Sequence, residues 1–187
     1  YDLGSDFDKA YDKIRVSTGK TGKQLEALKS DFKSVYAEVP AGMDDVAAAI
    51  GGLNAHLGLT KKPLRAMAQQ MVELSEITGD DLERNIVSVS KAFEAWKVPI
   101  KEQTDALDGL FRLQQSGGGT VADLADNMMK FSSPLRTLKF DVGEAAAMFA
   151  AFERGGVNTQ TMLPGLKFAI ANMSDPTADL ATQFKKL

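Results

Sequence analysis

The stretch STGKTGKQ at residues 17–24 holds the side chains that most resemble a site for chemistry. Loops that bind nucleotide phosphates carry Gly-x-x-x-x-Gly-Lys-Ser/Thr between a buried strand and a helix, where backbone N–H groups surround the phosphate. Counted back from the two Gly-Lys pairs, the first glycine of that pattern would fall on Ile14 or on Ser17. Neither residue is glycine, so the spacing excludes a phosphate-binding loop.

A turn between two helices explains the same residues. Before them, apolar side chains recur with the spacing of one helix face rather than of a strand, at Phe7, Ala10, Tyr11 and Ile14. Thr21 and Gln24 have the spacing of a capping box that opens a second helix. The apolar face of that helix comprises Leu25, Leu28, Phe32, Val35 and Tyr36. We therefore predict that Gly19 and Gly22 lie in the turn.

Other candidates for catalysis or metal binding are isolated from one another. His56 is the only histidine and the chain has no cysteine, so the sequence offers no second ligand of the kind zinc prefers and no nucleophile beside a base. The aspartate pairs at 44–45 and 80–81 are predicted to begin helices, where neighbouring side chains point in different directions. No calcium-loop spacing is present. A lytic mechanism based on glutamate alone would have to use Glu73, Glu76 and Glu153, and no signature surrounds them.

The remaining conspicuous side chains favour packing. Trp96 lies among apolar residues and is predicted to anchor neighbouring structural units. Methionines that fall mainly on apolar faces favour core filling: Met67, Met71, Met128, Met129, Met148 and Met162. The lysine pairs are too scattered to form a basic patch: Lys20 and Lys23, Lys61 and Lys62, and Lys185 and Lys186. We predict no catalytic, cofactor-binding or metal-ligating residue, no cofactor and no enzymatic activity.

Composition bounds the class of protein. The 187 residues are 44% hydrophobic and 25% charged, which is typical of one globular domain of ordinary size. The net charge of −3 and a pI near 5.3 give no direct site for nucleic acid. No apolar run approaches the roughly 18 residues that cross a bilayer. The chain starts at Tyr1 without a signal peptide and ends within a predicted helix, so we expect a segment of a longer polypeptide.

Helix start and stop signals recur at short intervals. Capping residues stand three positions before a carboxylate at 80–83, 120–123 and 141–144. Prolines stand where helices would begin, at Pro63, Pro99 and Pro176. Glycines predict helix ends at 79, 117–119 and 155–156, and a weaker one at 51–52.

The same pattern is repeated along the chain. A shift of 42 places residues 81–110 on 123–152, and a shift of 36 in the other direction pairs Pro63 with Pro99 and Ile50 with Ile86. Residues from about 43 to 156 therefore hold three versions of one unit: a helix, a short apolar connection, a second helix and a glycine turn. We call these connections elbows: LGLT at 57–60, WKVP at 96–99 and LKFD at 138–141. A fourth unit is predicted to begin at residue 156.

These signals predict an all-α protein of stacked helical hairpins, with internal repeats of about 40 residues and no sheet. We expect an N-terminal helical hairpin or arm at 1–40 and a core of hairpin repeats at 41–175. The start of a further, truncated helix is expected at 176–187.

Three stretches point to a family. They are the LT…L…ITG-D run at 59–80, the P-L-R-x-L-x-F elbow at 134–140, and the F-E-R-G-G-V-N turn at 152–158 that leads into T-x-L-P-G-L. In this order, and over residues from about 7 to 173, the chain resembles the core region of phage tail tape measure proteins.

The resemblance implies a mainly helical virion protein of a phage or phage-tail-like particle. Such a protein is made in the bacterial cytoplasm, lies inside the tail, sets tail length, and leaves through the tube as DNA is ejected. The implied partners are the tail tube protein, tail assembly chaperones, tail-tip or baseplate proteins, and further copies around the tail axis. Contact with a membrane is implied only during ejection.

Glycine and proline interrupt this segment too often for an uninterrupted helical ruler. We therefore expect a compact helical module of the tape protein rather than its measuring rod. The alternative is a cytosolic helical-repeat adaptor that binds a peptide or a helix of a partner protein.

Overall fold

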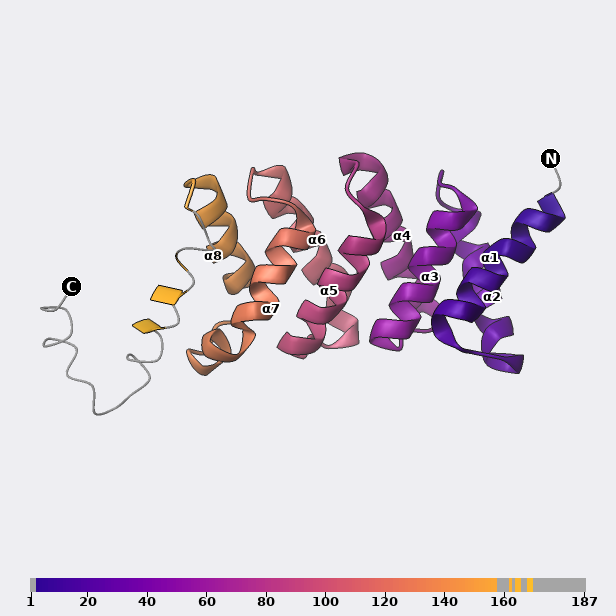
Figure 1. Ribbon diagram of the computed structural model, residues 1–187, viewed down its shortest axis with the longest axis horizontal. Coiled ribbons are helices and arrows are strands. Elements are labelled where there is room, and N and C mark those ends of the chain that lie inside the picture. Colours follow the sequence, from indigo (N-terminus) through magenta and orange to yellow (C-terminus); the bar gives the residue numbers. More distant parts are fainter. Residues whose placement is uncertain (1–2, 158–161, 163, 166–167, 170–187) are drawn as a thin grey trace, which may run out of the picture.

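A computed structural model describes residues 3–157, 162, 164, 165, 168 and 169, and among them the chain forms helices and no strand (Figure 1). The all-α prediction is confirmed. The α-helices are α1 (Leu3–Thr18), α2 (Gly22–Tyr36), α3 (Met43–Leu57), α4 (Lys61–Thr78), α5 (Leu82–Trp96), α6 (Gln103–Gln115), α7 (Val121–Thr137) and α8 (Val142–Arg154). A 3-10 turn, η1 (Ile100–Glu102), precedes α6.

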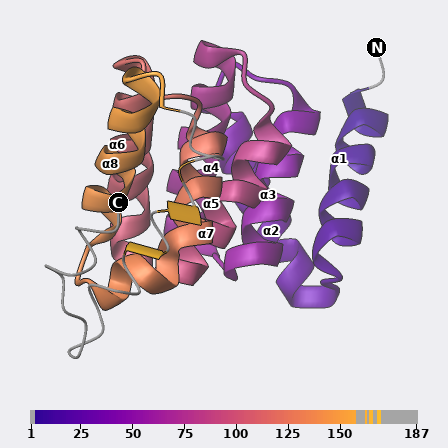
Figure 2. The same ribbon diagram turned by 60° about the vertical axis from the view of Figure 1, so that its left-hand side comes forward.

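The helices form two layers of a stack of hairpins. One layer contains α1, α3, α5 and α7, and each contacts the next; the other contains α2, α4, α6 and α8 in the same relation. Figure 1 and the turned view of Figure 2 both show the hairpins following one another from α1 and α2 to α7 and α8. One buried apolar cluster runs between the layers, which explains why no hairpin has to bury its apolar face alone.

The methionines and the apolar stripes contribute to that cluster as predicted. Met67, Met71 and Met128 are fully buried, and Met129 and Met148 are partly buried against it. The predicted division at 40/41 and 175/176 stays a prediction, and residues 176–187 lie outside the described residues.

The repeat spacing differs from the predicted shifts. The helices α3, α5 and α7 begin at Met43, Leu82 and Val121, so helix starts are spaced by 39 residues (82 − 43 and 121 − 82). The shift of 36 is therefore wrong. The shift of 42 fits from the second and third elbows onward, where it places the start of η1 on the start of α8 and buried Leu107 on buried Phe149. A helix nearly repeats its faces every three or four residues, so apolar positions alone match almost as well one turn out of register.

The elbows share one backbone device. Each contains a residue with positive φ: Gly58 (65°), Lys97 (54°) and Lys139 (67°). In the second elbow the N–H of Val98 donates to the carbonyl of Phe93, which closes the end of α5 in a Schellman arrangement. The apolar residue after each positive-φ position turns back to the core, which is the physical basis of the apolar-x-apolar pattern.

The predicted caps are correct at two helices and wrong at two others. Asp141 forms a full capping box with Glu144, and Thr120 accepts from the N–H of Asp123 at 3.1 Å. Thr21 stands at the start of α2 without a side-chain cap bond, because Gly22 next to it has φ of 55° and the first turn begins distorted. The cap of α5 is Asp81 rather than the predicted residue 80.

The glycine and proline signals are also mostly confirmed. α4, α6 and α8 end directly before glycine or within two residues of it, at Thr78, Gln115 and Arg154. Pro63 lies in the first turn of α4 and Pro99 directly precedes η1, whereas Pro176 lies outside the described residues.

The helix end predicted at 51–52 is wrong, because α3 continues through both glycines. A Cβ at Gly51 would lie 2.2 Å from the hydroxyl oxygen of Ser17 in α1, and one at Gly52 would lie 2.9 Å from Cγ2 of Ile86 in α5. These glycines allow two neighbouring helices to approach α3 closely, so their role is packing rather than termination.

Replacing Lys97 with glycine is expected to raise the free energy of unfolding by about 0.5–1 kcal/mol, because a left-handed backbone is strained for a residue with a Cβ. Lys91→Gly is the matched control at an exposed position within α5, where glycine should lower that free energy by about 1 kcal/mol. Urea unfolding followed by circular dichroism measures both. Equal destabilisation by the two substitutions would contradict the expectation.

Candidate functional site

His56 faces a hollow between α1, α3 and α5 without the partners of a catalytic base. Lys13 and Glu83 line the same hollow, where Nζ of Lys13 lies 3.5 Å from Oε1 of Glu83. Ser17 also lines it, but its hydroxyl donates to the carbonyl of Ile14 at 3.2 Å. The charges here pair with each other and the hydroxyl is bonded to the backbone, which leaves no activated nucleophile.

The other sequence candidates do not converge. Glu73 and Glu76 lie on α4 and Glu153 on α8. In the residues that the structure describes, no three His, Cys, Asp or Glu side chains are arranged to hold a metal ion. The aspartates at 44–45 lie in the first turn of α3, as predicted.

The predicted turn between α1 and α2 comprises residues 19–21; Gly19 lies in it as predicted, whereas Gly22 is the first residue of α2. Gly19 has φ of 63°, and its N–H donates to the carbonyl of Arg15 at 2.9 Å. The hydroxyl of Thr18 donates to the carbonyl of Ile14 at 2.7 Å and accepts from the N–H of Lys20 at 3.2 Å. These bonds close the end of α1 and occupy the N–H groups of Gly19 and Lys20.

A buried carboxylate joins the first two hairpins. Asp31 of α2 is 5% exposed, and its Oδ2 accepts from the N–H of Lys61 at the start of α4, at 3.0 Å. Its Oδ1 lies 3.2 Å from Nη1 of Arg65, one turn further along α4. Thr60, at the N-cap position of α4, forms no side-chain cap bond, so the acceptor for this helix end comes from the neighbouring hairpin.

Trp96 joins α5 to α7 as the predicted anchor between units. The indole is buried, and its Nε1 donates to the carbonyl of Met128 at 2.9 Å. At the same junction, Nη1 of exposed Arg136 donates to the carbonyl of Ala95 at 2.9 Å. The tryptophan therefore fixes the distance between two hairpins by both packing and a directional bond.

Replacing Trp96 with phenylalanine is expected to lower the free energy of unfolding by about 1–2 kcal/mol, because a buried carbonyl loses its indole partner. Arg136→Ala is the control at the same junction, and since that bond is exposed, its loss should cost about 0.5 kcal/mol or less. Thermal unfolding followed by circular dichroism compares them. A larger loss for Arg136→Ala would overturn this ranking.

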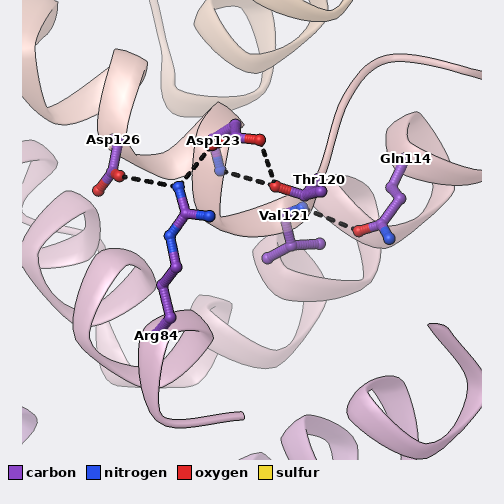
Figure 3. Close-up of polar contacts among 6 residues, drawn as sticks. All are labelled: Arg84, Gln114, Thr120, Val121, Asp123 and Asp126. Atoms are coloured by element: carbon purple, nitrogen blue, oxygen red, sulfur yellow. Dashed lines mark hydrogen bonds and ion pairs between the residues drawn. The ribbon is translucent and has the colours of Figure 1, made fainter. Parts of the chain in front are cut away.

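A second set of polar contacts joins the same two hairpins (Figure 3). Nη2 of Arg84 in α5 lies 2.6 Å from Oδ1 of Asp123 and 3.8 Å from Oδ2 of Asp126, both in α7. The hydrogen bond to Asp123, and after it the charge of that carboxylate, raise the pKa of the Arg84 guanidinium above its ordinary value. All three side chains are substantially exposed to solvent, so the contact orients the helices more than it stabilises them.

Gln114 continues this set of contacts towards α4. Its Oε1 accepts from the N–H of Val121 at 2.8 Å (Figure 3), and its Nε2 donates to Oδ2 of Asp80 at 2.7 Å. One amide thus caps the first turn of α7 and holds the turn before α5. Asp80 is thereby bound to α6, while the N-cap position of α5 is held by Asp81.

Three adjoining hollows lie along the surface between α4 and α6 and share lining residues such as Glu73 and Thr104; together they are here called the α4–α6 groove. Its middle is lined by Gln69, Gln70, Glu73, Thr104, Asp105 and Asp108. Apolar residues extend it towards the end of α4: Leu74, Ile77, Leu107 and Phe111. Towards the first turn of α4 it is lined by Lys62, Pro63, Ile100, Lys101 and Gln103 among others. A surface of this kind suits a chain laid along it better than an enclosed small molecule.

Sequence reasoning missed Asp31, Gln114 and the groove. The first two act on residues 30 and 34 positions away, as the separations to Lys61 and Asp80 show, and no local pattern marks such pairs. The groove depends on the distance between two helices of one layer, which only the fold sets.

Comparison with known proteins identifies a family for this chain. A family model described as "Phage-related minor tail protein" matches residues 8–187. No curated protein and no solved structure matches the chain. Among the described residues, no helix is both long enough and apolar enough to cross a membrane.

Proposed function

Because the chain belongs to the family of phage-related minor tail proteins, we propose that it is a structural segment of a tail tape measure protein. In this role it takes part in tail assembly, tail length determination and the passage of DNA during ejection, in a phage or a phage-tail-like particle. The family supports a structural role in the tail and gives no support to an enzymatic one.

The observation that carries the detailed proposal is the folded-back stack of hairpins (Figure 1). A continuous helix of residues 3–157 would span roughly 230 Å, at about 1.5 Å of rise per residue. In the stack, neighbouring helices of one layer pack about 8–10 Å apart, so the same residues span a length of only roughly 30 Å along the stack. As folded, the segment therefore adds little length per residue, which suits a compact module of the tape protein that folds by itself or docks at one end of the tail.

The proposed partners follow from this position. They are the tail tube protein, the tail assembly chaperones, the tail-tip or baseplate proteins, and further copies of the chain around the tail axis. The proposed location is the tail interior, after synthesis in the bacterial cytoplasm. Each is a proposal that rests on the tape measure role.

The test is an in-frame deletion of residues 43–156 in the gene that encodes the chain, with tail lengths measured by electron microscopy. The deletion removes roughly 170 Å of continuous helix, if the segment is part of an extended ruler. We expect tails of unchanged length that assemble poorly or fail to infect. Shortening by that amount would make the segment part of the ruler and contradict the compact module. Normal tails with normal infectivity would contradict the tape measure role and favour the adaptor.

A further inference from the structure

We propose that the α4–α6 groove binds an amphipathic helix of a partner protein, one that carries Lys or Arg beside apolar side chains. This goes beyond the proposed function, because it names a surface and the chemistry of its occupant wherever the segment lies in a tail.

The middle of the groove is acidic and lacks a cation of its own. Glu73 of α4 and Asp105 and Asp108 of α6 line it, and none of the residues lining this part is basic. Within the described part of the chain, Glu73 accepts an amide hydrogen bond from Gln69 at 2.9 Å and forms no ion pair. Asp108 pairs with Arg112, one turn further along its own helix, at 2.6 Å. In the other layer, by contrast, Arg84 of α5 crosses to the carboxylates of α7. A cation from outside would complete the equivalent pairing between α4 and α6.

Two glutamines line the walls, Gln103 buried and Gln70 partly buried. Gln103 is 6% exposed and lines the groove beside η1; its Nε2 donates to the carbonyl of Val98 at 3.2 Å. Gln70 lines the middle and donates to the carbonyl of Thr104 at 3.1 Å. The Oε1 atom of each is buried without a hydrogen-bond partner in the part of the chain that the structure describes. Each oxygen is closed to solvent, so an N–H donor of a ligand can reach it only after the glutamine side chain turns; the attraction for Lys and Arg comes from the carboxylates.

Apolar side chains at the two ends of the groove complete the match to an amphipathic helix. Ile77 is 69% exposed at one end and Ile100 is 52% exposed at the other. From Lys62 to Ile77 the groove follows α4 for roughly 23 Å, the length of a helix of about 15 residues. Exposed isoleucines at both ends would contact the apolar face of such a helix, while the carboxylates between them contact its cations.

The charges also set the direction of the bound helix. Lys62 and Lys101 lie together at the end of the groove where α4 begins. Cations stabilise the C-terminal end of a helix, because its free carbonyl groups carry partial negative charge. The partner helix should therefore run antiparallel to α4.

The experiment uses the full 187-residue chain and two synthetic helical peptides of about 15 residues, one of Lys and Leu and one of Glu and Leu in the same pattern. Fluorescence anisotropy of the labelled peptides gives the Kd. We expect the basic peptide to bind at least about tenfold more tightly than the acidic one. The triple variant Glu73→Gln, Asp105→Asn, Asp108→Asn should weaken binding of the basic peptide at least about tenfold.

A matched triple variant removes the same charge away from the groove: Glu38→Gln, Asp45→Asn and Glu94→Gln, all exposed positions. It should change the Kd by less than about twofold.

Ile77→Asn, which alters no charge, should weaken binding in the groove, and circular dichroism checks that every variant keeps its helices. Equal losses in the two triple variants would reveal general charge attraction and overturn the proposal, as would unchanged binding in the groove variant. Neither result depends on tail length. The peptide test can therefore contradict the groove proposal without contradicting the tape measure role, and the deletion test can do the reverse.

Discussion

Replacing Asp31 with alanine is expected to lower the free energy of unfolding by about 2–4 kcal/mol, the largest effect that we expect from a single substitution. The carboxylate is 5% exposed and accepts from the N–H of Lys61 and from Arg65, both in α4. Alanine leaves that N–H, in a partly buried joint, without its carboxylate acceptor and removes an ion pair between two hairpins. Arg65 is 41% exposed and can turn to water, which keeps the expected loss below that of a fully buried pair. Urea unfolding followed by circular dichroism measures it.

Two further variants separate charge from shape. Asp31→Asn keeps the volume and one carbonyl acceptor, so its loss should lie between zero and that of alanine. Glu94→Ala removes an exposed carboxylate of α5 and should change the free energy of unfolding by about 0.5 kcal/mol or less. If Asp31→Ala cost no more than Glu94→Ala, the joint between α2 and α4 would not depend on the carboxylate.

The helix ends could be predicted from the sequence because they depend on local chemistry. A free N–H group at a helix start attracts a side chain within three residues, as at Asp141, and a left-handed backbone at a helix end favours glycine, as at Gly79. Where the hydrogen-bond acceptor for a helix start comes from a distant part of the chain, the local sequence pattern does not predict it. The acceptor for α4 comes from Asp31, and the second acceptor at the start of α7 comes from Gln114.

The errors at 51–52 and in the repeat shift have one cause. A glycine in a helical pattern can mark either a helix end or a close contact with another helix. Apolar residues three or four apart can be aligned in either of two registers one turn apart. Only the neighbouring helices decide between these alternatives. Gly51 lies against Ser17 of another hairpin, so the chain needs a small residue there rather than a break. The shift of 36 aligned apolar faces one turn away from the 39-residue spacing of the helix starts. The absence of catalytic residues stays a prediction, and the α4–α6 groove had no counterpart in the sequence pattern.

Deletion of residues 82–120 is expected to leave tail length unchanged, although it removes roughly 60 Å of continuous helix. The deletion takes out one hairpin, α5 with α6, and joins Asp81 to Val121. Asp81 is the cap of α5 and Thr120 the cap of α7, so an aspartate replaces a threonine at an equivalent position. The helices that follow keep their layers, and stacked repeats tolerate the loss of a whole unit.

Deletion of residues 82–102 is the matched comparison, because it removes a single helix and joins Asp81 to Gln103. Every later helix would then have to change layers, exposing apolar faces such as that of Phe131 and Phe149, so this smaller deletion should abolish productive tails. An extended ruler gives the opposite order: tails shortened by roughly 60 Å and roughly 30 Å, in proportion to the residues removed. Electron microscopy of tails from both deletions therefore distinguishes a folded module from a measuring rod. In a folded module the outcome depends on whether the remaining helices keep their layers. In a measuring rod the tail length depends on the number of residues removed.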